Sequence, residues 1–219
     1  MRMTWTITLR NVCVTIALAS ALAGCGPILA PRNDPSKFYL LTPTADPPST
    51  QTAAVQSSAG GFTLGLGPVK LPPYLDRPEV VTRSAPNRLD LSKTDRWGES
   101  LQNNFTSVLT RDLSAQIGTQ QIVTFPWYST THIDLQVQVE VYRFETDAQG
   151  NAQLSAKWTI RDGTGKNILY SAESNLTQPS KPGDTADAAA ALSRTVSDMS
   201  REIANMVQQV RARNTTPPA

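Results

Sequence analysis

Three successive segments of this chain alternate apolar and polar side chains between residues 133 and 176. The side chains of a β-strand point alternately to its two faces, so this pattern predicts three strands that bury one common face. Turn-forming sequences at residues 149–151 and 162–165 separate the segments, which favours an antiparallel meander. The alternation shifts by one position near Val141–Arg143, which predicts a β-bulge. The apolar positions are Ile133, Leu135, Val137, Val139 and Val141, then Leu154, Ala156, Trp158 and Ile160, then Ile168, Tyr170, Ala172 and Leu176.

Two shorter apolar segments precede the meander and predict further strands. The first is the run Phe38–Leu41, and the second is an alternating stretch from Phe62 to Leu66. Pro68 interrupts the second stretch, so we expect that strand to lie at a sheet edge or to contain a bulge.

Two segments have the periodicity of amphipathic helices. The first runs from about Asp95 to Ile117 and ends before Gly118. The second follows Pro182–Gly183, with Asp184 or Thr185 as its N-cap. Its large apolar residues, at spacings of three and four, are Leu192, Val196, Met199, Ile203, Met206 and Val210.

The apolar seam of the second helix has two explanations, packing on its own sheet or an intermolecular coiled coil. A sheet with one apolar face needs more cover than one helix gives, which favours the first. We therefore predict an α+β fold, an antiparallel β-sheet with two α-helices packed on one face. The seam on Leu192–Val210 remains one possible self-contact in a homo-oligomer.

The N-terminus has the pattern of a bacterial lipoprotein signal. Arg2 and Arg10 flank its start, and the apolar run Val12–Ala21 is shorter than the roughly 20 residues that a membrane-spanning helix needs. Small residues then lead to Cys25, an arrangement that resembles the lipobox. We expect residues 1–24 to be removed and Cys25 to carry the lipid; the alternative is an ordinary secretory signal with a chance cysteine.

Composition divides the remainder into one domain with polar extensions. Residues 25–36 contain three prolines and predict a lipidated tether, and residues 37–210 predict a single α+β periplasmic domain. Residues 42–61 predict a flexible loop, and residues 211–219 a disordered tail. The two cysteines of the chain are Cys13 and Cys25, so the mature domain has no disulfide.

Charge and chemistry exclude several classes of function. The formal net charge of the chain is +2, and two arginines belong to the signal peptide, so a neutral mature domain argues against nucleic-acid binding. His132 is the single histidine, and no Gly-x-Ser-x-Gly motif accompanies it, which argues against a serine hydrolase. We predict no enzyme activity, no metal and no cofactor other than the covalent lipid on Cys25.

A series of short motifs resembles a known family. Its members are the segments 38–41, 65–83, 87–89, 96–101 and 125–127, which read FYLL, GLGPVKLPPYLDRPEVVTR, NRL, RWGESL and FPW. In this order they resemble the PqiC/YmbA-type ABC-transport auxiliary lipoproteins. The resemblance implies a non-enzymatic partner of an MCE-domain protein, in a system that moves lipids between the inner and outer membranes. The long polar loop 42–61 departs from the family pattern, and no function is carried onto it.

The segment 71–83 is the candidate partner-binding surface. Two prolines stiffen its start, which reduces the entropy lost on docking, and tyrosine and arginine are favoured interface anchors. The alternative is a loop that packs on its own core, and the two interpretations have about equal weight. The candidate anchors are Leu71, Tyr74, Leu75, Arg77 and Arg83.

An aspartate directly after the lipidated cysteine would resemble an inner-membrane retention signal, but this chain has Gly26 at that position. We therefore expect the protein on the periplasmic face of the outer membrane, where it is lipid-anchored. A second function remains open, that of a scaffold or activator lipoprotein for another envelope machine, such as cell-wall synthesis or secretion.

The first prediction concerns the anchor. Each buried CH₂ contributes about 0.8 kcal/mol to membrane binding, so several acyl chains hold a protein far more tightly than one. We expect Cys25→Ser to move the protein into the soluble periplasmic fraction, and sucrose-gradient separation to place the wild type with the outer membrane. A Cys25→Ser variant that sediments with membranes as the wild type does would show that the lipobox assignment is wrong.

Overall fold

The computed structural model describes residues 34–44 and 61–215. The chain divides by its internal contacts into two units, Met1–Pro35 and Ser36–Ala219, and every described helix and strand belongs to the second. The expected signal peptide, Cys25, residues 25–33 of the expected tether, residues 45–60 of the expected loop and residues 216–219 lie outside the described residues.

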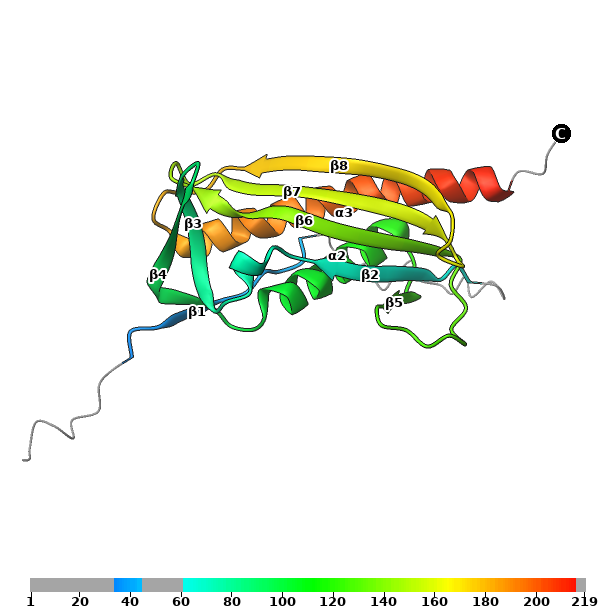
Figure 1. Cartoon of the computed structure of the whole chain (residues 1–219), viewed down its shortest axis with the longest axis horizontal. Coiled ribbons are helices and arrows are strands. Elements are labelled where there is room, and N and C mark those ends of the chain that lie inside the picture. The colour runs from blue at the N-terminus through cyan, green and yellow to red at the C-terminus, as the bar shows by residue number, and fades with distance from the viewer. Residues whose placement is uncertain (1–33, 45–60, 216–219) are drawn as a thin grey trace, which may run out of the picture. The chain divides into compact units, whose positions relative to one another are not determined.

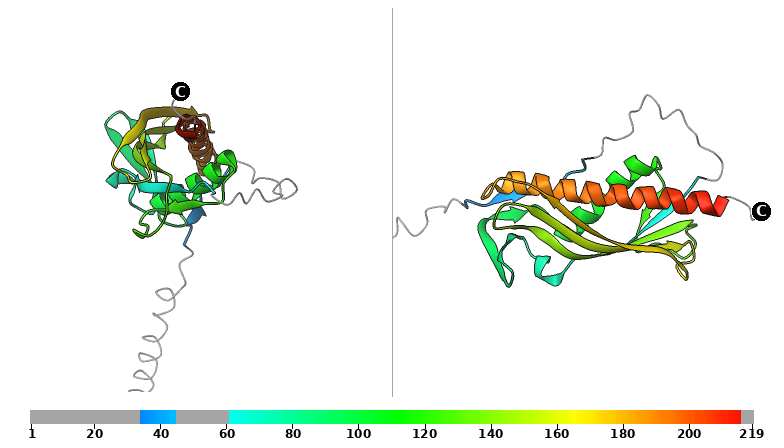
Figure 2. Two further views of the ribbon diagram at one scale, coloured as in Figure 1. Left: turned by 90° about the vertical axis from the view of Figure 1, so that its right-hand side faces the viewer. Right: turned by 90° about the horizontal axis from the view of Figure 1, so that it is seen from above.

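The described part of the second unit is one sheet with two helices on one of its faces (Figures 1 and 2). The predicted α+β class is confirmed, and both helices pack against the sheet. The strands are β1 (Lys37–Tyr39), β2 (Leu64–Lys70), β3 (Glu79–Ala85), β4 (Arg88–Trp97), β5 (Ile122–Thr124), β6 (Leu135–Asp147), β7 (Ala152–Asp162) and β8 (Ile168–Gln178). The helices are α2 (Leu101–Ile117) and α3 (Thr185–Thr215), with a 3-10 turn, η2 (Pro73–Leu75), between β2 and β3.

Strands β6, β7 and β8 form the antiparallel meander that the alternation predicts. The register between β6 and β7 shifts between Val141 and Arg143, so the predicted bulge is confirmed. A carboxylate closes the β6–β7 turn: Asp147 Oδ1 accepts the backbone N–H groups of Gln149 and Asn151 at 3.0 and 2.8 Å. Burial raises the pKa of Asp147, but the hydrogen bond from the Asn151 side chain, together with these backbone bonds, outweighs it, and the pKa lies below its ordinary value.

The rest of the sheet is mixed, whereas the alternation predicted a purely antiparallel sheet. β2 pairs in parallel with both β5 and β6, and β1 in parallel with β4. For the pairs of β2, the physical reason is the long connection that carries α2 between β2 and its partners β5 and β6, because a crossover of this kind brings strands together in the same direction. The parallel pair of β1 and β4 is joined by the part of the chain that contains β2 and β3. β2 has neighbours on both sides at Leu64–Leu66, so it is not an edge strand there, but its register does shift between Leu66 and Val69, around Pro68.

Helix α2 begins at Leu101, six residues later than the predicted start at about Asp95. The segment before it belongs to β4, because Asp95, Arg96 and Trp97 pair with β1, and the Trp97 side chain is buried. The apolar spacing of Trp97 therefore reflects a strand that ends in the core. Gly118, in the left-handed conformation, ends α2 as predicted.

Helix α3 begins with the predicted cap, because Asp184 Oδ1 accepts the N–H groups of Ala186 and Asp187, both at 3.1 Å. The residues of its seam, Leu192, Val196, Met199, Ile203 and Val210, are buried in the core, and Met206 packs against it. The seam therefore packs within the domain, and is not the self-contact that we considered. The helix continues to Thr215, past the predicted start of a disordered tail at residue 211. Neither described helix has the length and hydrophobicity of a membrane span.

The second prediction tests the close packing at the β7–β8 turn. A Cβ atom on Gly163 would lie 2.0 Å from the backbone oxygen of Ile133, whereas a Cβ on Gly183 would meet nothing within 4 Å. We expect Gly163→Ala to lower the free energy of unfolding by about 3 kcal/mol or more, because the backbone of either segment must move. The matched variant Gly183→Ala, strained only by its positive φ, should lose about 1 kcal/mol. Equal losses in urea denaturation would contradict this packing.

Candidate docking site on the Leu71–Arg83 segment

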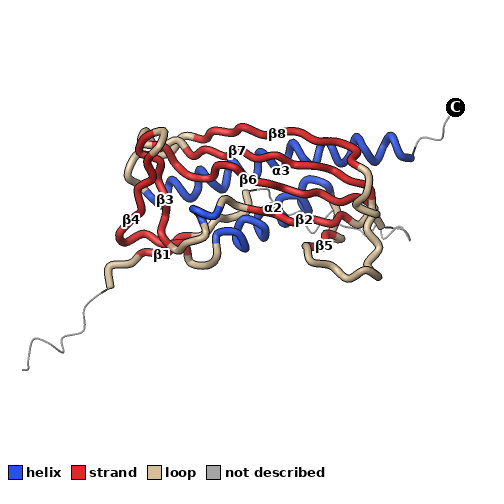
Figure 3. Tube along the Cα trace, viewed as in Figure 1, coloured by secondary structure: helices blue, strands red, loops and turns tan. Residues whose placement is uncertain are grey.

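The Leu71–Arg83 segment crosses a break in the pairing of β6. β2 pairs with β6 as far as Lys70 and Glu140, and β3 joins the same edge only at Thr82 and Thr146. Between these points the described chain places η2 beside β6 in place of a strand (Figure 3). Two hydrogen bonds close the turn, from the N–H of Leu75 to the oxygen of Pro72 at 3.0 Å, and from the N–H of Asp76 to the oxygen of Pro73 at 3.1 Å.

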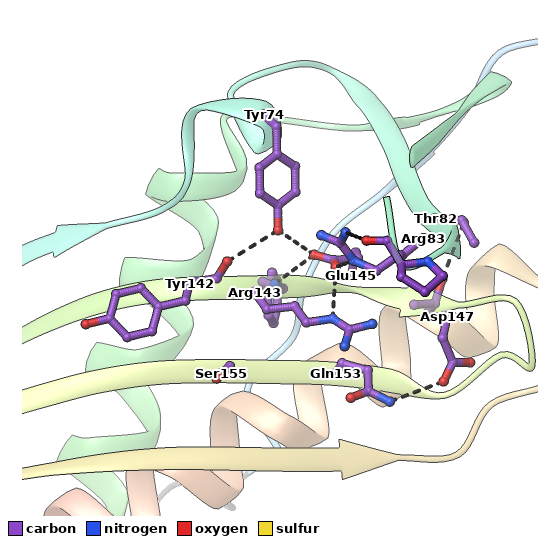
Figure 4. Close-up of polar contacts among 12 residues, drawn as sticks. Tyr74, Thr82, Arg83, Tyr142, Arg143, Glu145, Asp147, Gln153 and Ser155 are labelled. Atoms are coloured by element: carbon purple, nitrogen blue, oxygen red, sulfur yellow. Dashed lines mark hydrogen bonds and ion pairs between the residues drawn. The ribbon is translucent and has the colours of Figure 1, made fainter. Parts of the chain in front are cut away.

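A buried carboxylate lies under this segment (Figure 4). The side chain of Glu145 has no exposed surface, and three side chains converge on it: Tyr74, Arg83 and Arg143. The Tyr74 hydroxyl donates to Oε2 at 2.7 Å, while Arg83 Nε and Arg143 Nε donate to Oε1 at 2.6 and 3.0 Å. The backbone N–H of Phe144 donates to Oε2 at 3.0 Å. We call these four residues, Tyr74, Arg83, Arg143 and Glu145, the Glu145 cluster.

The electrostatics of the Glu145 cluster keep its phenol protonated. Burial, followed by the hydrogen bond to Glu145 and the charge of that carboxylate, raises the pKa of Tyr74 to about 12. The hydrogen bond to Glu145 likewise raises the pKa of Arg83, and its guanidinium carbon lies 5.9 Å from the centre of the Tyr74 ring. A neutral phenol and a carboxylate already bound by four donors suit a structural clamp better than a nucleophile or a general base.

Of the five predicted anchors, three are engaged within the domain and two keep surface exposed to solvent. Leu75 is 2% exposed and lies in the core, and Leu71 packs against the core while partly exposed. Tyr74 and Arg83 belong to the Glu145 cluster, whereas Arg77 is exposed. For Leu75, the alternative interpretation therefore holds: this residue packs on the domain's own core. Arg77 and the exposed part of Leu71 remain available to a partner.

The sequence did not single out Glu145 or Arg143 as parts of a site. The exchange of faces after the bulge shows that Glu145 points away from the helices, where an acidic residue is ordinarily solvated. Its burial depends on Tyr74, which lies 71 positions earlier in the chain. No local sequence pattern predicts that Tyr74 and Glu145 come into contact.

The histidine considered for catalysis lies in an exposed place. His132 Nε2 is 3.1 Å from Asp134 Oδ1, and the histidine side chain is 82% exposed. Within residues 34–44 and 61–215, no group of three or more His, Cys, Asp or Glu side chains is arranged to hold a metal ion.

Comparisons with solved structures place this fold among known proteins. Protein XCC0632 from Xanthomonas campestris is 17% identical, with a TM-score of 0.64 over 83% of this chain and all of its own length. An uncharacterized protein is 16% identical, with a TM-score of 0.62 over 78% of this chain and 98% of its own. At these identities the similarity concerns the fold alone.

The sequence comparisons identify a family. No curated protein matches the chain. The family model described as the ABC-type transport auxiliary lipoprotein component matches residues 39–204, which extend from the end of β1 into α3. This match agrees with the motif resemblance and covers well over half of the chain. The chain therefore belongs to the family of ABC-type transport auxiliary lipoprotein components.

Proposed function

We propose that this protein is a non-enzymatic auxiliary component of an MCE-type ABC lipid transport system, held on the periplasmic face of the outer membrane by lipid on Cys25. The observation that carries the proposal is the extent of the family match, which takes in nearly all of the described fold. Family membership supports an auxiliary role in transport. The MCE-domain partner and the outer membrane are the further steps that we propose.

The contacts of the Glu145 cluster support a binding role over a catalytic one. The buried carboxylate is bound by two arginines, a tyrosine and a backbone N–H, so these charged contacts hold the fold together. They hold η2 in place on β6 and leave Arg77 exposed at the end of a stiff turn. A preformed surface of this kind loses little conformational entropy on docking.

We propose that the MCE-domain partner contacts the exposed side of η2, with Arg77 as the charged anchor and Leu71 as the apolar one. Tyr74 and Arg83 act indirectly, because they position the turn through Glu145. A scaffold or activator role in another envelope machine would require a different partner at the same surface.

The third prediction tests Arg77. We expect Arg77→Ala to reduce co-purification of the lipoprotein with the MCE-domain protein by about tenfold, the loss that a truncated interface arginine of about 1.4 kcal/mol would cause. The thermal melt should stay unchanged, because Arg77 is exposed. Arg201→Ala, which removes an exposed arginine of α3, is the matched control and should co-purify as the wild type does. Full retention by Arg77→Ala would remove this residue from the interface.

The fourth prediction tests Tyr74 as a positioning residue. Tyr74→Phe keeps the ring but removes the hydroxyl from Glu145, so we expect the free energy of unfolding to fall by about 1 to 2 kcal/mol at pH 7. The pKa of Tyr74 is raised from 10 to about 12, so its stabilising contribution is complete below pH 10 and is lost as the pH rises through 12. The difference in stability between wild type and Tyr74→Phe should therefore shrink between pH 10 and 12. A constant difference over that range would contradict the clamp.

A further inference from the structure

A groove of about 720 Å³ lies between β2, α2 and the segment that follows β5. Residues 66–70 of β2 form one side of it, and residues 124–126 form its rim. In Figure 1, α2 runs beside β2 and β5. The α2 side chains on the opposite wall are Gln102, Asn103, Thr106, Ser107, Thr110 and Arg111.

The charged side chains of the groove are both cationic. Lys70 and Arg111 are exposed, and no aspartate or glutamate belongs to the lining. Neither cation makes a side-chain hydrogen bond or ion pair with the part of the chain that the structure describes. The carboxylate that follows Arg111 in α2, Asp112, is buried on the inner side of the helix. The groove therefore carries a positive potential that favours an anionic ligand.

One side of the groove is a short strand edge. β5 pairs with β2 only along Leu64–Leu66, and the N–H of Phe125 makes the last contact, to the oxygen of Leu66 at 2.8 Å. Beyond that point the described strands pair with β2 on its β6 side alone, at Val69 and Lys70. An open strand edge is a template for an extended chain, which gains main-chain hydrogen bonds from it.

The remaining lining suits a peptide better than an acyl chain. The wall from α2 carries hydroxyl and amide groups, and the Thr106 and Thr110 hydroxyls donate to the helix backbone, which leaves their oxygens as acceptors. A hydrocarbon chain would give the side-chain amides no hydrogen-bond partner and would leave the two threonine oxygens without a donor. Phe125 is 54% exposed at the rim and stacks edge-to-face on Trp127 at 5.4 Å, so it offers one rigid apolar contact.

We propose that this groove binds an extended acidic peptide segment, whose carboxylates pair with Lys70 and Arg111 and whose apolar side chain rests on Phe125. The identity of the protein that supplies this segment, a component of the transporter, rests on the proposed function. It is a second contact, separate from η2, and two linked contacts raise the overall affinity above that of either alone.

The fifth prediction measures this binding without any transporter component. The full lipidated chain in detergent is titrated with a fluorescein-labelled peptide of alternating valine and glutamate, and binding is followed by fluorescence anisotropy. We expect the wild type to bind this peptide at least about tenfold more tightly than a valine–glutamine peptide, because the cations select carboxylates. Lys70→Glu with Arg111→Glu should lose the glutamate peptide and bind a valine–lysine peptide instead. Arg201→Ala is the control and should bind as the wild type does.

Each other outcome overturns the groove proposal. Absence of binding, equal binding of the glutamate and glutamine peptides, or unchanged binding by the charge-reversed variant would do so. Binding of phosphatidylglycerol vesicles that the charge reversal abolishes, without any peptide binding, would assign the site to lipid headgroups. Failure here leaves the proposed function intact, whereas a wild-type protein that does not co-purify with the MCE-domain protein would overturn that function and not the groove.

Discussion

The fold depends on how a break in the pairing of β6 is closed. One edge of β6 receives β2 as far as Glu140 and β3 from Thr146, and the bulge near Val141 lies between them. An uncompensated carboxylate buried there would cost several kcal/mol. Glu145 instead binds donors from η2, from β3 and from β6 itself. The same interaction therefore satisfies the buried charge and fixes where the chain turns between β2 and β3.

This arrangement gives β2 a central position between two surfaces of different character. At its C-terminal end the chain enters η2, a turn closed by two hydrogen bonds, and the exposed Arg77 follows two residues after it. Along its other edge, past the end of β5, it borders the cationic groove with Lys70 and Arg111. Both surfaces are built on backbone elements that pack on the core, so the backbone need not become ordered on binding. Such preorganisation fits the docking role that we propose for this auxiliary protein.

Some sequence patterns predicted their elements closely and others did not, for a common reason. The meander, its bulge and the Asp184 cap are local features, and the structure contains all three. The β3–β4 hairpin was missed, and β4 contradicted the predicted helix start, because Trp97 has an apolar spacing that a helix and a buried strand share. Parallel pairing of β2 with β6 was also missed, since it joins residues about seventy positions apart.

The sequence alone determined the α+β class, the meander, the two helices and the family, because each is recorded in residues close together in the chain. Tertiary structure decided that the sheet is mixed, and which of the proposed anchors are bonded within the domain. Tyr74 and Arg83 look like surface anchors in the sequence, yet both donate hydrogen bonds to Glu145, which lies far away in the chain. Likewise Lys70 and Arg111 lie on separate elements and share a groove only after β2 and α2 pack together. Long-range packing decides which charges are paired and which stay exposed, and no local pattern of residues contains that information.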